Sequence, residues 1–293
     1  MSIYLSKKKV NPQVPLSFYG TTLKDFITKR DCKRLFDTCT AERIDSIIAY
    51  DDTSFATTMD SMFQHCSHLQ TIPLLNTNKV TDMSDMFNGC SSLTFIPLLN
   101  SNKVTNMTGM FQECSSLITI PSFDTINVTK MVKMFYNCTS LHDIPSLDVT
   151  NVVSMESMFQ GCTNLQSVAL TNTTKVLNMG NMFEDCINLQ IIPEMDVSNV
   201  TNLDRFITGC TNITTIHIKN IKSDLDISDC SKMTREALVE VLNNLQKVTT
   251  QHTLTLTRKI FHPGGYYIYD PVLLNKLTEE DKKIATDKGW TLK

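Results

Sequence analysis

The 293-residue sequence lacks the features that mark several large classes of protein. No apolar run approaches the length of a membrane span, so membrane insertion is not expected. No CxxC pair occurs, which leaves a zinc ribbon without support, and the phrase His65-Cys66-x-His68 appears in one place alone. The sequence also lacks a phosphate-binding loop and an arrangement of nucleophile, base and acid. We therefore expect no enzymatic activity, no catalytic residues, no cofactor and no metal.

The N-terminal segment has neither the order of a secretory signal nor a nucleic-acid motif. Its three lysines follow a very short apolar piece, which is the wrong order and length for a signal peptide. We therefore expect synthesis in the cytoplasm without a signal peptide. Residues 1–34 carry eight basic and two acidic residues, a local charge of +6. A basic segment can meet nucleic acid, a membrane surface or an acidic protein, and without a nucleic-acid motif we favour a solvated or protein-docking arm.

What the sequence has is one phrase that returns every 24 residues with no insertion. Its first column contains Met62, Met86, Met110, Met134, Met158, Met182 and then Phe206. Its second column contains Cys66, Cys90, Cys114, Cys138, Cys162, Cys186 and Cys210. A leucine follows each cysteine at plus three, until Ile213, and an isoleucine or valine follows at plus six. These columns are the expected inward positions of a coil.

A constant period of this length is typical of leucine-rich-repeat solenoids, in which each coil adds a short strand to a parallel sheet. We predict such an α/β repeat fold with about eight coils. Invariant spacing follows from stacking, because one extra residue would rotate every later side chain out of its column. The cysteines in phase are predicted to be buried and reduced, since each has an identical neighbour on both sides and free cysteine packs as a small apolar residue.

Each regular coil is expected to contain a strand, a turn and a return segment. The strand is placed around residues 69–72, with the proline that often follows at its end. The turn carries an Asn or Asp column that bonds local backbone N–H groups or bridges the coils. The return segment has apolar residues at spacings of three and four, which predicts a short helical turn. The turn's polar column contains Asn76, Asn100, Asp124, Asp148, Asn172, Asp196 and Asn220.

The chain is expected to divide into four parts. Residues 1–20 are an extended docking arm, and residues 21–34 are a helical cap that starts at Thr21 or Thr22. The solenoid covers residues 35–229, and residues 230–293 are an α/β cap. Within this last part we expect a helix capped by Thr234, a strand over residues 253–257, a protruding aromatic turn over 261–269 and a helix over 277–288.

The phrase from Val80 to Leu93 resembles the repeat of the BspA-like leucine-rich-repeat surface proteins, over about residues 35–230. The tail from Lys276 to Leu292 is similar to those that close such arrays in bacteriophage structural proteins, and the opening residues 3–10 resemble the leading strands of phage virion proteins. The resemblance implies the fold. Ligand identity does not carry over, because the variable residues of the strand face determine it.

Two functions fit these observations. The surface members of the family usually carry an export signal or an anchor, and because we expect neither in this chain, a virion protein is the first hypothesis. The first hypothesis is a non-enzymatic phage virion protein, located in the virion and displaying the solenoid as a decoration or as a host-surface-binding element. The alternative is a bacterial or protist cell-surface adhesin. The expected partners are virion structural proteins, with a host surface protein or glycan and a second copy of the chain as further candidates, and no nucleic acid is expected.

The candidate binding residues fall in two groups. The docking residues of the arm are expected to be Ile3, Tyr4, Leu5, Lys7, Lys8 and Lys9. Residues just after the leucine column vary from coil to coil while their neighbours do not. Two interpretations fit this variation equally well, a partner-binding face and neutral drift on a solvated face. The candidates on this face and in the aromatic turn are Phe95, Ile118, His142, Ile191, Tyr266 and Tyr267.

Overall fold

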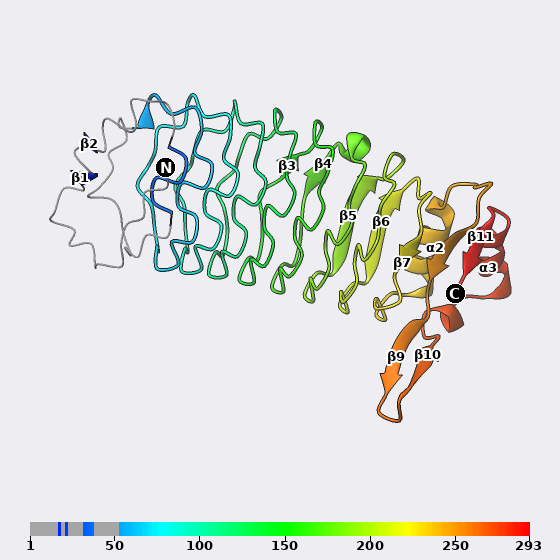
Figure 1. Ribbon diagram of the computed structural model, residues 1–293. Coiled ribbons are helices and arrows are strands. Elements are labelled where there is room, and N and C mark those ends of the chain that lie inside the picture. Colours follow the sequence, from blue (N-terminus) through cyan, green and yellow to red (C-terminus); the bar gives the residue numbers. More distant parts are fainter. Residues whose placement is uncertain (1–16, 19–20, 23–31, 38–52) are drawn as a thin grey trace.

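A computed structural model describes residues 17–18, 21–22, 32–37 and 53–293 of the chain. Figure 1 shows a row of similar coils stacked side by side, which ends in a C-terminal cap and a projecting hairpin. The coils have little regular secondary structure, and the strands that join them are two to six residues long. The elongated repeat fold with short parallel strands therefore follows the prediction, while the number of coils stays a prediction.

Parallel pairings join the coils on the strand side. β3 (Leu147–Asp148) pairs with β4 (Leu170–Thr171), and β5 (Ile191–Asp196) pairs with β6 (Thr215–Lys219). A short 3-10 helix, η2 (Thr173–Lys175), follows β4. Near the N-terminus, β1 (Ser17–Phe18) pairs antiparallel with β2 (Thr21–Thr22). Within the described residues, no helix is both long and apolar enough to cross a membrane.

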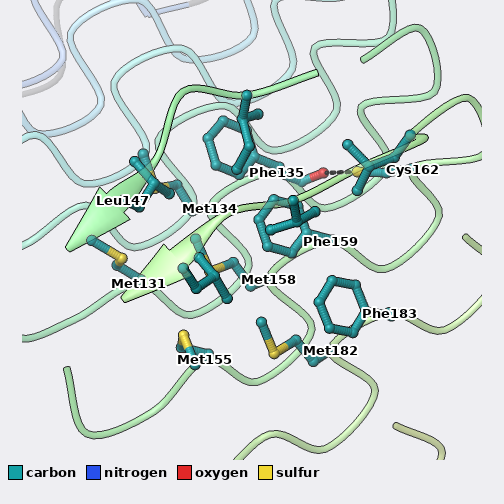
Figure 2. Close-up of a cluster of buried hydrophobic side chains, with 14 of the residues drawn as sticks. Met131, Met134, Phe135, Leu147, Met155, Met158, Phe159, Cys162, Met182 and Phe183 are labelled. Atoms are coloured by element: carbon teal, nitrogen blue, oxygen red, sulfur yellow. Dashed lines mark hydrogen bonds between the residues drawn. The ribbon is translucent and has the colours of Figure 1, made fainter. Parts of the chain in front are cut away.

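The repeated apolar side chains form continuous rows through the core, as Figure 2 shows for Met134, Met158 and Met182. The phenylalanine that follows each methionine stacks on its counterpart, with ring centroids 5.3–5.6 Å apart and nearly parallel planes. The row ends where Phe206 replaces a methionine and meets Phe183 edge-on, at an interplanar angle of 74°. The sequence columns therefore correspond to stacked rows of buried side chains.

The cysteine column has a second role that its spacing did not reveal. Each thiol donates a hydrogen bond to the backbone carbonyl of a phenylalanine in the preceding coil, with sulfur–oxygen distances of 2.8–3.1 Å. Figure 2 shows this bond between Cys162 and Phe135. Burial raises the pKa of the Cys210 thiol to about 12 and raises the pKa of Cys138 as well. The buried thiols are therefore expected to be unreactive, and their hydrogen bonds join neighbouring coils.

We expect the nine cysteines that the structure describes to resist thiol labelling in the native protein, because all nine are buried. The thiolate is the reactive form, and the raised pKa of Cys210 lowers its thiolate fraction about a thousandfold at a given pH. Mass spectrometry after labelling with and without denaturant gives the measurement. Rapid native labelling of most of these residues, or a consistent disulfide pattern, would contradict the ladder.

The return segment is not the helical turn that the sequence predicts. Alternate N–H groups, those of Met83, Asp85, Phe87 and Gly89, donate to carbonyls of the next coil at 2.8–3.0 Å. The N–H groups of Met86, Asn88 and Cys90 bond three residues back, as from Cys90 to the Phe87 carbonyl. A backbone that alternates in this way needs left-handed residues, and φ is 50° at Asp85 and 76° at Gly89. The same two positions of the other regular coils are left-handed too.

The proline that follows the isoleucine column does not end the strand in every coil, contrary to the prediction. Pro193 lies inside β5, where the register with β6 shifts between Ile192 and Met195. A proline is tolerated at such an irregularity because no ladder hydrogen bond is required of its nitrogen. The strand therefore continues past the proline to Asp196.

The Asn and Asp column has both of the predicted roles. The Asp148 side chain accepts from the Thr150 N–H at 2.9 Å, which caps the turn locally. The Asn220 amide donates to the Asp196 carboxylate at 3.1 Å, which bridges two coils. The column is therefore part of the turn architecture.

The first coil begins earlier than expected. Cys32 and Arg34 donate their N–H groups to the carbonyls of Thr58 and Asp60, in the same pattern as Met59 and Ser61 of the next coil. Arg34 has φ 54°, so the predicted helix does not extend to Arg34. The remainder of that predicted helix, at residues 23–31, lies outside the described residues, and so do residues 1–16 and 19–20 of the predicted docking arm.

The C-terminal cap contains two helices and a three-stranded parallel sheet. The helix α2 (Arg235–Asn244) starts at the cap Thr234, as the sequence predicts, and α3 (Glu279–Thr286) starts at Thr278. The sheet has the order β11 (Trp290–Leu292), β8 (His252–Thr255), β7 (Leu225–Asp226). A 3-10 helix, η3 (Leu274–Lys276), precedes α3.

An ion pair joins the two helices of the cap. Arg235 donates two hydrogen bonds to the Asp281 carboxylate, at 2.7 and 2.8 Å. These bonds and the capping bonds with Thr278 lower the pKa of Asp281 to about 2. A carboxyl group whose pKa is lowered in the folded state stabilises that state at pH values above the ordinary pKa of an aspartate. The stabilisation from this pair is therefore lost as the pH falls from about 4 towards 2.

The hairpin of β9 (Arg258–His262) and β10 (Tyr266–Asp270) takes the place of the predicted aromatic turn. It is antiparallel and closes through the turn at Gly264 and Gly265, where φ of Gly265 is 86°. Figure 1 shows it extending away from the coils and from the cap.

Candidate interaction face

On the strand side of each regular coil, two outward residues lie between two buried ones. In one coil Leu93 and Ile96 point into the core, while Phe95 between them is 54% exposed. Backbone bonds from Thr94 to the Gln70 carbonyl keep the coils in register, so equivalent residues stack in columns across this face. Outward side chains of successive coils therefore form one continuous surface.

Two of the apolar candidates on this surface lie in neighbouring coils, and the third does not. Ile118 is 56% exposed and belongs to the coil after that of Phe95. Ile191 is also exposed, but it lies three coils farther along the array. The structure therefore brings Phe95 and Ile118 into one region of the face and leaves Ile191 apart.

His142 and Asp143 form a hydrogen-bonded pair on the same face. The His142 Nδ1 and the Asp143 Oδ2 are 2.5 Å apart, and Ser167 donates to the other carboxylate oxygen at 3.1 Å. The bond from His142 lowers the pKa of Asp143, so its carboxylate is the stable form. Both side chains are exposed, and the pair offers a polar contact beside Ile118, whose carbonyl accepts from the His142 N–H.

A hollow that begins a few residues after the leucine column of the coils was not predicted from the sequence. Leu74 and Leu98 occupy the same position of consecutive coils, and both are exposed, Leu98 by 62%. They line a hollow of about 450 Å³ together with polar residues of the turn column, among them Asn100 and Asp124. The signal was present, because the next two coils have Ser122 and Ser146 at this position.

The two tyrosine candidates lie at the other end of the molecule, on β10 of the hairpin (Figure 1). The Tyr266 ring stacks on His262 with centroids 4.5 Å apart, and Tyr267 meets Phe261 edge-on at 5.3 Å. The Lys259 ammonium lies over the Tyr267 ring, 4.0 Å from its centroid. These aromatic residues therefore form a surface separate from the strand face.

The docking residues predicted for the arm, Ile3, Tyr4, Leu5 and Lys7 to Lys9, lie outside the described residues. In the part of the chain that the structure does describe, no group of three or more His, Cys, Asp or Glu residues could hold a metal ion. Of the phrase His65-Cys66-x-His68, the cysteine is buried and donates to a carbonyl, and His68 lies beside the Ser67 hydroxyl at 3.2 Å.

Three solved structures resemble this chain at low identity, and two of them are named as leucine-rich or leucine-rich-repeat proteins. The leucine-rich-repeat protein TpLRR of T. pallidum has 17% identity and a TM-score of 0.37, over 69% of this chain and 79% of that one. The plant peptide hormone receptor RGFR1, in complex with RGF2, has 15% identity and a TM-score of 0.25, over 70% of this chain and 41% of the receptor chain.

A leucine-rich cell surface protein of Faecalibacterium prausnitzii has 17% identity and a TM-score of 0.20, over 66% of this chain and 76% of that one. All three TM-scores are low, so the fold assignment rests on the stacked 24-residue coils of the chain itself. None of the curated proteins matches the sequence.

One protein family matches most of the array. Its description is "Mycoplasma protein of unknown function, DUF285", and it matches residues 30–119, 57–171, 95–191 and 154–261. These overlapping matches together cover more than half of the chain, including every regular coil. The chain belongs to this DUF285 family.

Proposed function

We propose that this chain is a non-enzymatic protein-binding module of a bacterial cell surface, and that it binds its partner on the strand face. The observation that carries the proposal is the gathering of exposed apolar side chains on three successive coils, from Leu74 through Phe95 and Leu98 to Ile118. Contiguous exposed apolar groups rimmed by polar residues are characteristic of protein interaction sites.

The chemistry of this region suits a protein partner. Leu74 and Leu98 contribute exposed apolar groups to the lining of the hollow, while Asn100 and Asp124 contribute polar groups that can exchange hydrogen bonds with a backbone. Phe95 is the large aromatic side chain of the region, and aromatic residues are enriched among those that dominate binding energy. A partner with a short apolar segment therefore fits this face.

The bacterial surface hypothesis now has more support than the virion hypothesis. The family match is to proteins of a bacterium, Mycoplasma, and the repeat phrase resembles bacterial surface proteins. The virion hypothesis rests on the weaker resemblance of the tail and of the opening residues. Fractionation of the native source separates the two, because enrichment in the cell envelope supports the surface location, and co-sedimentation with phage particles contradicts it.

The binding face is tested by replacing Phe95 and Ile118 together with serine. We expect binding to weaken by at least ~1 kcal/mol, the usual threshold for a significant interface residue, with little change in stability because both side chains are exposed. The partner is first captured with a photo-reactive amino acid at Phe95 and identified by mass spectrometry. Its affinity for each variant is then measured by calorimetry with the purified partner.

The matched control is Ile187→Ser, which removes an exposed apolar side chain from another column of the array. The control is expected to bind as tightly as the unmodified chain. The proposed face is wrong if the double variant retains full affinity, or if the control loses as much as the double variant does.

A further inference from the structure

The β9–β10 hairpin has two open edges among the described residues. Five residue pairs join its strands, from Tyr266 with His262 to Asp270 with Arg258, and no third strand of the described residues pairs with either. Figure 1 shows it clear of the coils and of the cap. A two-stranded hairpin is marginally stable by itself, so a projecting hairpin of this composition gains from further pairing.

The two edges differ in composition. β9 carries Arg258 and Lys259, and charged side chains of this kind commonly protect an edge strand from pairing. β10 has the run from Tyr266 to Tyr269, four uncharged residues of high strand propensity, and all four are exposed, Tyr269 by 65%. A long apolar edge without charge is a site for pairing with another strand. The open edge of β10 is therefore the stronger candidate for an interface.

The cations of the hairpin are already engaged within the chain. Arg258 bonds the Asp229 carboxylate at 2.8 Å, which ties the base of the hairpin to the last part of the array. Lys259 lies over the Tyr267 ring. The hairpin is thus held at its base, and β10 carries a single charge, that of Asp270 at the end of the strand.

We propose that β10 pairs with β10 of a second copy of this chain, antiparallel and centred on Ile268. This inference goes beyond the proposed function and does not use the strand face. Antiparallel pairing about Ile268 places Tyr267 of one copy opposite Tyr269 of the other, and aromatic cross-strand pairs stabilise sheets. It also places Asp270 opposite Tyr266, whose hydroxyl can donate to that carboxylate.

A second copy is favoured because β10 is complementary to itself and β9 is not. The corresponding pairing of β9 about Ile260 would place Arg258 opposite His262, and both cations of each copy would lie along the seam. In the β10 pairing the carboxylates lie at opposite ends of the seam, next to hydroxyl groups. Both copies together form a four-stranded sheet, with β9 and its charges on the two outer edges. Since the seam is short, the dimer should be weak, on the order of micromolar.

Cysteine cross-linking tests the register. Ile268→Cys places the two introduced cysteines opposite each other. Opposite residues of an antiparallel pair have Cα atoms roughly 4.5–5.5 Å apart, which is within the range for a disulfide. The matched control is Ile260→Cys, because Ile260 is the cross-strand neighbour of Ile268 within the hairpin but lies on the protected strand. We expect Ile268→Cys to form a covalent dimer at least tenfold faster than Ile260→Cys, with the unmodified chain as the background.

Sedimentation of the full chain over a dilution series tests the dimer itself. We expect a reversible monomer–dimer equilibrium, which Ile268→Lys abolishes by placing two like charges opposite each other, while Ile260→Lys retains it. Circular dichroism establishes that both variants remain folded.

The proposal is overturned if the unmodified chain is monomeric at every concentration, if both cysteine variants cross-link equally fast, or if Ile268→Lys still dimerises. The proposal is also overturned if the unmodified chain is monomeric and Ile268→Lys abolishes its binding to another protein, because that protein would then supply the strand that pairs with β10. The Phe95→Ser, Ile118→Ser variant should dimerise normally, so failure of the strand-face proposal is distinguishable from failure of this one.

Discussion

Replacing Phe135 with alanine should lower the free energy of unfolding by about 3–5 kcal/mol, the range for removing a large buried aromatic side chain. The Phe135 ring is fully buried and stacks on two others, with centroids 5.6 Å from Phe111 and 5.4 Å from Phe159. Its loss weakens the interfaces with both neighbouring coils, because the stability of a repeat array is carried between nearest neighbours. Chemical denaturation monitored by circular dichroism gives the measurement.

The position in the row should matter as much as the side chain. Phe206 at the end of the row has one aromatic neighbour among the described residues, so Phe206→Ala should be less destabilising than Phe135→Ala. The exposed Phe95 serves as the control for aromatic content, and Phe95→Ala should change the stability little. Equal losses at Phe135 and Phe95 would show that the stacked rings do not hold the coils together.

Replacing Trp290 with alanine should destabilise the C-terminal cap by about 3–5 kcal/mol. Trp290 is 2% exposed, and its indole N–H donates to the Gln246 carbonyl at 2.8 Å, just past the end of α2. Nearby, the Lys288 ammonium donates to the Asn243 carbonyl at 2.7 Å. Because contacts in an array are local, the cap should open before the central coils, and hydrogen exchange resolved along the chain measures this order.

A second substitution separates packing from hydrogen bonding at this site. Trp290→Phe keeps most of the apolar volume and removes the donor to Gln246, so it should destabilise the cap by about 0.5–1.5 kcal/mol, the net contribution of an ordinary hydrogen bond, because Gln246 is exposed and water can replace the donor. The exposed Tyr267 is the control, since Tyr267→Ala should leave the exchange of the cap unchanged. Exchange that accelerates equally in the cap and in the central coils would contradict the local character of the opening.

The core could be predicted from the sequence because stacking constrains it strongly. Each buried column repeats one kind of side chain, as in Met134, Met158 and Met182, and the spacing alone identifies the inward positions. The predicted start of α2 at Thr234 is also confirmed, since its hydroxyl accepts from the Ala237 N–H. Periodic burial and helix caps are local signals, and both can be recognised without a structure.

The backbone of the return segment could not be predicted in the same way. Lys133 and Ser157 are left-handed, although neither residue favours that conformation, because hydrogen bonds to the next coil require it. A spacing of three and four residues fits a helical turn equally well, and the hydrogen bonds between coils decide the outcome. Leu98 was missed because it resembles a core leucine until the structure shows its exposure.

The direction of the hydrogen bonds gives the row of coils a chemical polarity, like that of a filament whose two ends differ. In the return segment each coil donates N–H groups to the next coil, as from Phe87, and accepts a thiol donor from that coil, as from Cys114 to the Phe87 carbonyl. This forward pattern of hydrogen bonds ends at Gly209. Its N–H donates to the Asp229 carboxylate at 2.9 Å, whereas the equivalent N–H of an earlier coil donates to a backbone carbonyl of the next coil. The Asp229 carboxylate thus takes the place of a backbone acceptor at this end of the row, and it also binds Arg258 at the base of the hairpin. Coils could be added or removed in the middle as whole 24-residue units, whereas the terminating carboxylate has to stay at the forward end.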